Sequence, residues 1–451
     1  MRQNLAGWFL GSVGLLFAAQ CHAQSLSELL ALALGGEPTY LGAKTNVDSA
    51  RAKADQAFGA LLPQVSATAG TNANDRDYVT RSSGTPEAKD RYNSNSAQMN
   101  LTQPIWRYAN YVGFRQAKMI LAQADYQLAG AEQDLFAKVV VAWFDVLAAR
   151  DSVQFTAQQT AAAQRQWAVL RRGLELEITS QPQVEEGRAR LDQALADAAA
   201  AEADAEVKFS ALEQIVGTLQ KFDLPYMRDD AMLADLNQDK LDTWLAAVET
   251  DNPNIQAAQH AFAAAAAEVS KQRAGHYPVL DLVGSYGRNS QSVGGFPGQD
   301  GYGITQGSIG LQLNIPIFSG GTQQAKVAEA EAQKEKARLD IESARRAAVL
   351  ALNQAWHGWR AARARTLAGS QAIKAAQAAL AVASAGVKND LKTELDVLQA
   401  EQQWRAARRD FRKGRYDQVV AYIRLKSTVG KLTAADIGTL DALLVFGAGH
   451  G

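Results

Sequence analysis

The chain has 451 residues, and its 46 Lys and Arg nearly balance its 47 Asp and Glu, which leaves a formal net charge of -1 at pH 7. This balance provides no basic field for phosphate groups, so we expect no nucleic-acid partner. The single cysteine excludes an intramolecular disulfide and a cysteine-based zinc site.

The N-terminal segment 1–23 has the pattern of a secretory signal peptide. Arg2 gives a positive start, Leu5–Ala19 is apolar, and a small-residue cleavage site ends at Ala23. We therefore expect 1–23 to be removed. The apolar run is short and is followed by polar sequence, which disfavours the alternative of an uncleaved anchor. No later stretch has the 18 or so apolar residues of a spanning helix, so any membrane-embedded part would have to be a β-barrel.

The sequence repeats itself at a nearly constant offset. The recurring landmarks are Pro38 and Pro253, Pro63 and Pro278, Pro104 and Pro316, Trp143 and Trp356, Gly173 and Gly386, and Gly217 and Gly430. We expect two copies of one unit, 24–218 and 252–431, joined by 219–251 and followed by a tail, 432–451. The period is too long for a solenoid, so each copy should be a large substructure.

Each unit opens with an Ala-rich helix, expected at 37–60 and 253–275, that ends at a proline. Two runs of alternating polar and apolar residues follow. They predict strands at 65–78 and 93–105 in the first unit and at 279–290 and 304–318 in the second, around surface loops 79–91 and 287–303. Periodicity alone fits a soluble hairpin on a core as well as a pair of membrane strands.

Aromatic residues favour the membrane interpretation. Trp106 and Phe318 end the second predicted strand of each unit, and four tyrosines flank the loops: Tyr78, Tyr92, Tyr286 and Tyr302. Two aromatic belts about ten residues apart would match the height of an outer-membrane apolar band. The strand-to-helix transitions that follow carry Pro104 in the first unit and Pro316, Gly320 and Gly321 in the second.

A very long helix is expected next in each unit, at about 107–172 and 321–388, followed by a shorter one at about 183–218 and 394–430. Apolar residues recur three and four positions apart between Leu121 and Val153, which is typical of a coiled-coil seam. At 1.5 Å per residue the first long helix would measure ~100 Å. A domain of this size has no core that deep, so the helices must pack side by side.

Four strands per chain raise a closure problem. An open sheet in lipid leaves unpaired backbone amides at both edges, and each costs several kcal/mol. A closed membrane barrel needs about eight strands or more. Several chains must therefore contribute strands to one barrel.

Together these features resemble the TolC-like outer-membrane factors. The resemblance is carried by Ile315-Pro316-Ile317-Phe318-Ser319-Gly320-Gly321, by its partner Gln103-Pro104-Ile105-Trp106, and by the turn sequence from Lys392 to Ala400. It implies a fold of α-helices plus transmembrane β-strands: a homotrimer with a twelve-stranded outer-membrane barrel, continued by a twelve-helix periplasmic tube. It also implies an exit duct of a Gram-negative bacterium, set in outer-membrane lipid and docked by a periplasmic adaptor (membrane fusion protein) and an inner-membrane transporter.

The resemblance further implies roles at the periplasmic aperture. Asp396 matches the first of the family's paired aspartates, whereas Gln399 occupies the second position, which would leave one carboxylate ring. Lys392 matches the family's latch arginine, and Gln183 occupies the aspartate position in the first copy. The alternative for Asp396 is an ordinary solvated helix carboxylate.

The leading functional hypothesis is the exit duct of a type I protein secretion system. The close alternative is the same duct serving small-molecule efflux with a proton-driven pump. Cys21 follows Gln20 rather than the small residue a lipid anchor needs, which favours secretion because many efflux members carry an anchor. A periplasmic coiled-coil adaptor or scaffold is the alternative from another class. Zincin, nucleophile-elbow, Walker and dinucleotide motifs are missing, so we expect no enzyme, cofactor or metal site.

Overall fold

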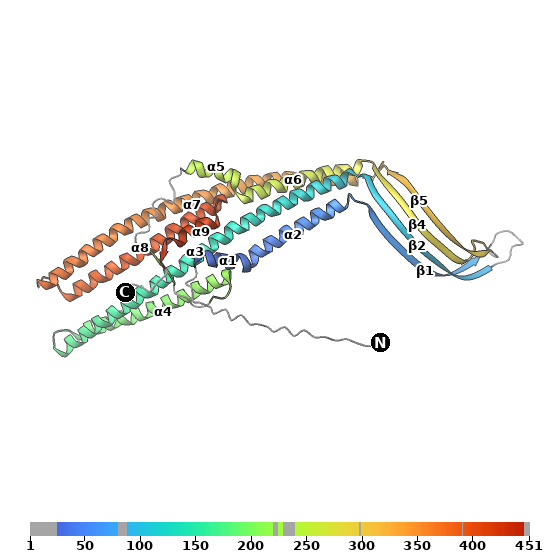
Figure 1. Cartoon of the computed structure of the whole chain (residues 1–451). Helices are drawn as coiled ribbons and strands as arrows, with labels where there is room; N and C mark the ends of the chain where they lie inside the picture. Colours follow the sequence, from blue (N-terminus) through green and yellow to red (C-terminus); the bar gives the residue numbers. More distant parts are fainter. Residues whose placement is uncertain are drawn as a thin grey trace, which may run out of the picture.

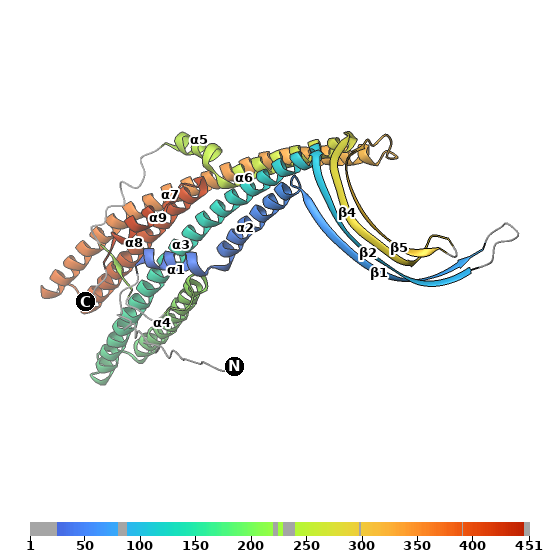
Figure 2. The same cartoon turned by 45° about the vertical axis from the view of Figure 1, so that its right-hand side comes forward.

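The computed structural model has a sheet at one end and long helices over the rest of its length (Figure 1). It describes residues 25–79, 88–219, 224–228, 240–296, 299–389 and 391–445. The expected signal peptide at 1–23 lies outside these ranges, and so do 80–87 of the first expected loop and 446–451 of the tail. Turning the molecule by 45° shows that the strands curve together away from the helices (Figure 2).

Four antiparallel strands form the sheet in the order β1-β2-β4-β5, so β1 and β5 are its edges. Their bounds are β1 Gln64–Tyr78, β2 Ala88–Trp106, β4 Val279–Val293 and β5 Asp300–Asn314. Residues directly opposite in the ladder share a face. The continuous register from β1 to β5 therefore assigns every strand residue to one of two faces.

The two faces differ in chemistry. One is apolar over most of its length and carries Val65, Ala67, Ala69, Met99, Leu101, Leu280, Leu282, Ile309, Leu311 and Leu313. The other is polar and carries Ser66, Thr68, Asn72, Gln98, Asn100, Ser285, Asn289, Gln306, Ser308 and Gln312. Helices do not cover the apolar face of the edge strand: Ile309 is 75 % exposed and Leu311 69 % exposed.

The loops are shorter than the sequence indicates. β2 begins at Ala88 rather than at 93, and residues 287–293 and 300–303 belong to strands rather than to a loop. On the β1–β2 hairpin, cross-strand ion pairs help such polar ends to pair as strands. Lys89 lies 3.2 Å from Asp77, for example, on the first hairpin. Polar composition was therefore a poor guide to the strand ends.

The last strand also stops earlier than expected, at Asn314 instead of 318. Its final ladder partner is Val279, the first residue of β4, and Pro278 before it has no N–H to donate. Residues 315–318 thus have no strand to pair with. Phe318 stands 88 % exposed beyond the sheet.

Long helices continue from the sheet. α3 (Tyr108–Glu175) has 68 residues and α7 (Thr322–Lys388) has 67, so each is ~100 Å long at 1.5 Å per residue. α4 (Gln181–Val216) and α8 (Glu394–Val429) return from their far ends, and α2 (Pro38–Gly59) and α6 (Pro253–Arg273) lead into the sheet. Among the described residues, no helix is both long enough and apolar enough to span a membrane.

The helices form a single curved layer (Figures 1 and 2). Next to the sheet the order is α2-α3-α6-α7, and beyond the middle of the molecule it is α4-α3-α8-α7. α2 and α4 therefore occupy one lateral edge of the layer, and α7 runs along the other. The sequence of helix, two strands, long helix and shorter helix occurs twice along the chain.

Short elements thicken the layer at its middle. The sequence did not predict α1 (Leu26–Gly36), α5 (Leu241–Asp251), α9 (Ala434–Asp441) or the strand pair β3 (Tyr226–Met227) and β6 (Leu444–Val445). α1, α9 and the strand pair enclose fully buried Trp143, Phe144 and Leu147 of α3. α5 packs Trp244 and Val248 against α7.

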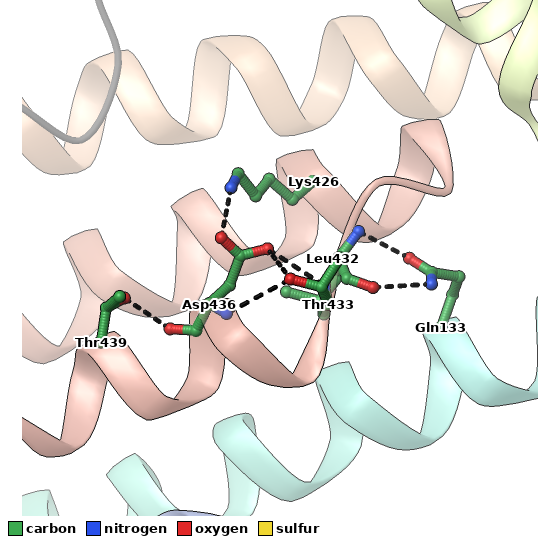
Figure 3. Close-up of polar contacts among 6 residues, drawn as sticks. All are labelled: Gln133, Lys426, Leu432, Thr433, Asp436 and Thr439. Carbon is green, nitrogen blue, oxygen red and sulfur yellow. Dashed lines mark hydrogen bonds and ion pairs between the residues drawn. The ribbon is translucent and has the colours of Figure 1, made fainter.

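Polar contacts tie the tail to the long helices (Figure 3). The Gln133 side chain on α3 bonds both the N–H and the carbonyl of Leu432, each at 2.9 Å. Lys426 of α8 lies 2.6 Å from Asp436, which also accepts from Thr433 at the start of α9. These bonds order an eight-residue helix that would be unstable alone.

Two arginines, partly buried Arg150 and buried Arg415, hold the chain between α4 and α5. Arg150 donates to the carbonyls of Leu224 and Pro225 at 2.7 and 2.8 Å, and Arg415, 2 % exposed, donates to the carbonyl of Arg228 at 2.6 Å. Buried Asp151 accepts from Arg150 and from the Tyr416 hydroxyl. Burial and the neighbouring carboxylate together raise the pKa of Tyr416, so its hydroxyl stays a donor.

A bidentate ion pair joins the two strand–helix junctions. Arg107, the residue before α3, donates to both carboxylate oxygens of Asp281 on β4 at 2.7 and 2.5 Å. The Asp281 side chain is 10 % exposed and the Arg107 side chain 39 % exposed. Removing Arg107 would leave an almost buried carboxylate without its cation.

We expect Arg107→Ala to destabilise the protein by roughly 2 kcal/mol, within the range for lost hydrogen bonds to a charged group, because Asp281 is nearly buried while Arg107 is partly exposed. The measurement is thermal loss of helicity in detergent, followed by circular dichroism. Arg91→Ala is the matched control because its pair with Asp75, at 3.1 Å, has side chains that are 86 % and 67 % exposed. Equal shifts for the two variants would contradict the assigned role of the buried pair.

Candidate functional site

The two helical hairpins end in tips at the end of the molecule opposite to the sheet (Figure 1). The α3–α4 turn forms one tip and the α7–α8 turn forms the other. Lys392, Asp396 and Gln399 lie together on the α7–α8 hairpin, whereas Gln183 lies on the α3–α4 hairpin. In both views the two tips are separate (Figures 1 and 2).

Asp396 forms a capping box at the start of α8. Its carboxylate accepts from the Thr393 N–H and the Thr393 hydroxyl, both at 2.8 Å, and its own N–H donates back to that hydroxyl at 3.3 Å. Gln183 holds the equivalent place at the start of α4. Its side-chain oxygen accepts from the Ser180 N–H and hydroxyl, both at 3.0 Å. Both residues therefore cap a helix.

The capping hydrogen bonds also set the charge of Asp396. The Thr393 N–H and hydroxyl hold the pKa of the Asp396 carboxyl below its usual value, and the nearby positive charge of Lys392 acts in the same direction. Asp396 is therefore ionised at neutral pH. Gln183 carries no charge in the same position.

Glycines let the two turns fold tightly. The Gly386 carbonyl accepts from the N–H groups of Leu391 and Lys392 at 2.8 and 3.2 Å. A Cβ at Gly386 would come within 2.9 Å of the Lys392 side chain, and one at Gly173 would overlap the Thr179 hydroxyl. The Lys392 chain therefore runs across Gly386.

Gln399 lies one turn beyond Asp396 and is exposed. It lines a groove of about 340 Å³ between α3 and α8, together with Phe155, Gln158 and Arg405. Arg405 pairs with Glu401 in this groove. Gln399 thus belongs to the groove between two helices of one chain as well as to the hairpin tip.

Both tips project a large apolar side chain that the sequence reading missed. Ile178 is 79 % exposed and Leu391 is 81 % exposed. The offset between them in the sequence is the one that relates Gly173 to Gly386. Aligning the two turns at that offset would have revealed them.

The sheet separates the six predicted aromatic residues. Trp106 lies opposite Leu280 and Tyr286 lies opposite Met99, which places both on the apolar face. The register places Tyr78, Tyr92 and Tyr302 on the polar face. Phe318 lies beyond the end of β5, as described above.

Two aromatic residues of the polar face take part in local packing. Arg76 stacks over the Tyr92 ring at 5.3 Å and pairs with Asp90 at 2.7 Å. The Tyr78 ring meets the Phe296 ring edge-on at 6.4 Å. Of the five predicted aromatic residues that the ladder assigns to a face, Trp106 and Tyr286 lie on the apolar one.

The strand–helix residues differ between the two repeats. Pro104 lies inside β2 at a shift in register between Pro104 and Trp106, where a missing N–H is tolerated. Pro316 lies beyond the end of β5. Gly320 and Gly321 have φ values of 62° and 77°, a left-handed conformation that favours glycine. They turn the chain into α7.

Among the described residues, no group of three or more His, Cys, Asp or Glu is placed to hold a metal ion. The described residues offer charged and apolar side chains at the tips, and a sheet with one polar and one apolar face.

Comparisons with known proteins agree with this geometry. The sequence profile of the family described as "Outer membrane efflux protein" matches residues 29–218 and 244–431. The chain is 27% identical to outer membrane protein TolC of Vibrio cholerae, over 98% of each chain. It is 26% identical to the proteases secretion protein PrtF of Dickeya chrysanthemi, over 95% of this chain and 92% of that one. The CmeC outer membrane channel of Campylobacter jejuni has the same fold, with a TM-score of 0.76 and 15% identity over 98% of both chains.

We expect Thr393→Ala to weaken the start of α8 by about 1 kcal/mol, because it removes the N-cap acceptor. Hydrogen exchange of the first-turn amides, measured by mass spectrometry, should become about fivefold faster. Ser384→Ala is the control, since that hydroxyl only bonds back to Leu380 within α7. Unchanged hydrogen exchange of the first-turn amides of α8 would show that the capping box formed by Thr393 and Asp396 does not stabilise the start of this helix.

Proposed function

The chain belongs to the outer membrane efflux protein family, and from this premise we propose that it is the homotrimeric outer-membrane exit duct of a type I protein secretion system. The protein is located in the outer membrane and takes part in transport, as its relatives do. It would dock a periplasmic adaptor and an inner-membrane ABC transporter.

The observation that carries the proposal is the four-stranded sheet with one apolar face, one polar face and two open edges. An apolar face suits lipid and a polar face suits a water-filled interior. Closure requires other copies, because the edge strands of one chain lie at opposite ends of the strand order. Three copies would supply twelve strands, and the four-helix layer of each copy would supply a twelve-helix tube.

The repeat organisation fits this assembly. We propose that units 24–218 and 252–431 are two copies of one substructure, each adding a hairpin to the barrel and a helix pair to the tube. Segment 219–251 and tail 432–451 would thicken the middle of the tube, where α5, α9, β3 and β6 lie.

At the tips, Asp396 from three chains would form one carboxylate ring at the periplasmic aperture, with Lys392, Gln399 and Gln183 beside it. Ile178 and Leu391 would offer apolar contacts to the adaptor, since both stand largely exposed at the tips.

The secretion role is favoured by the likeness to PrtF, whose name describes protease secretion. The second candidate is small-molecule efflux with a proton-driven pump, which the family name favours. Membership of an outer-membrane family argues against a periplasmic adaptor or scaffold.

We expect the protein to fractionate with the outer membrane and to migrate as a trimer that dissociates on heating. In a strain lacking its own outer-membrane factor, coexpression with an ABC exporter and adaptor should restore export of a large repeat-type protein. Restored drug resistance without protein export would favour the efflux alternative. Recovery as a soluble periplasmic monomer would contradict the duct.

We expect Asp396→Asn to reduce cation selectivity and block by divalent cations in planar bilayers, because three fixed carboxylates would be lost. The bonds from Thr393 lower the Asp396 pKa, whereas neighbouring carboxylates in a ring would oppose that shift. The parent channel should therefore keep its block at neutral pH and lose it on acidification, as the ring protonates.

The matched control is Asp410→Asn, which removes a carboxylate from the same helix but away from the tip, where Asp410 pairs with Arg409. It should leave selectivity unchanged. Equal cation selectivity and equal divalent block in Asp396→Asn and the parent would contradict the proposal that Asp396 lines the aperture.

A further inference from the structure

The outward edge of α4 carries a row of acidic residues. α4 packs on α3 through buried Val184, Gly187, Ala194 and Ala201. Glu185, Asp192 and Glu206 are exposed and are spaced by one heptad and then by two, so they share one side of the helix. Exposed alanines lie between them on this side: Ala189, Ala196 and Ala203. Small residues flanked by charges are typical of a close helix–helix seam.

The outward edge of α7 carries the opposite charge. Arg346, Arg360, Lys374 and Lys388 are exposed and recur once in every two heptads. Their side of the helix also carries Leu350 and Leu367, which are 59 % and 68 % exposed. Leu352, Trp356 and Trp359 of α7 are buried against α5 and α8.

The imbalance of charge extends along both helices. Residues 343–389 contain seven Arg and Lys and no Asp or Glu, whereas residues 181–216 contain eight Asp and Glu and three Arg and Lys. Arg346 already pairs with Glu342 at 2.7 Å, whereas Asp192 has a longer contact with Arg188 in its own helix, at 4.0 Å. The row relevant to a partner is therefore Arg360, Lys374 and Lys388.

The two rows lie at matching levels on opposite edges of the layer. α4 climbs from its tip to the middle of the molecule, and the last half of α7 descends from the middle to its tip (Figures 1 and 2). In the order α4-α3-α8-α7 these helices are the two outermost. Rotating a second copy into place beside the first would bring its α4 edge against the α7 edge.

We propose that the acidic row of α4 and the basic row of α7 form the contact between neighbouring copies of this chain in the lower half of the tube. The inference rests on the homotrimer proposed above. It adds to it the residues that join the helical layers and a dependence on ionic strength. Head-to-tail contact of this kind uses two different patches of each copy and closes a ring.

A charge-reversal exchange tests the proposal on the full-length protein in detergent. One variant carries Arg360→Glu with Lys374→Glu, a second carries Asp192→Lys with Glu206→Lys, and a third combines all four. Either pair alone places like charges across every junction, whereas the combination restores attraction with exchanged signs. We expect each double reversal alone to raise the monomer-to-trimer ratio roughly tenfold in low salt. The fourfold variant should have a ratio close to that of the parent.

Light scattering after size exclusion gives the ratio. In about 1 M salt, where the Debye length is ~3 Å, the differences between variants should shrink. The matched control is Lys413→Glu with Arg424→Glu, two exposed cations on α8, which lies between α3 and α7 and not at an edge. The control should keep the ratio of the parent.

The outcomes separate this proposal from the trimer itself. A parent that is trimeric, with both reversed variants equally stable in low salt, would overturn the proposed contact and leave the duct standing. Failure of the combined variant to recover would also overturn it. A parent that is monomeric under all conditions would overturn the trimer and the contact together.

Discussion

The two open edges of the sheet impose the constraint on which the rest of the molecule depends. β1 and β5 are each 15 residues long and end the strand order on opposite sides. Their outward N–H and C=O groups have no ladder partner within the described part of the chain. In lipid each such group would cost several kcal/mol. In the duct proposed above, a sheet that presents Ile309 and Leu311 to its surroundings would need partners that pair both of its edges.

The same two sides continue into the helices. α2 and α4 follow the side of β1, and α7 follows the side of β5, so the helical layer also has two free lateral edges. A layer one helix thick and ~100 Å long buries little surface within one chain. The chain builds a thicker core only around Trp143 and Phe144, where α1, α9 and the strand pair β3–β6 lie across α3. Arg107 and Asp281 fasten the other critical point, where strands become helices.

Much of the fold could be predicted from the sequence because its signals are long and regular. Apolar spacing of three and four indicated the first long helix and the repeat offset placed the second, and the bounds of both agree with the structure to within three residues. The short elements escaped because their order depends on distant contacts: α9 is held by Lys426 and by the bonds from Gln133 to Leu432. The alternation of side chains along a strand could also have assigned the predicted aromatic residues to a face of the sheet. Tyr92 and Met99 are separated by an odd number of positions on one strand, so they point to opposite faces, and that parity separates Tyr92 from an apolar belt.

At the tips, the two capping boxes separate the structural role of Asp396 from its charge. Gln183 makes the same two hydrogen bonds to Ser180 that Asp396 makes to Thr393. A neutral amide oxygen is therefore sufficient to close the box. A carboxylate gains only about 0.3–1 kcal/mol more from the helix N-terminus, and α4 does without that gain. Capping explains why an acceptor stands at position 396, but it does not explain why that acceptor is charged. The carboxylate ring proposed above would use this charge, which the box residue carries at the α7–α8 tip and not at the α3–α4 tip.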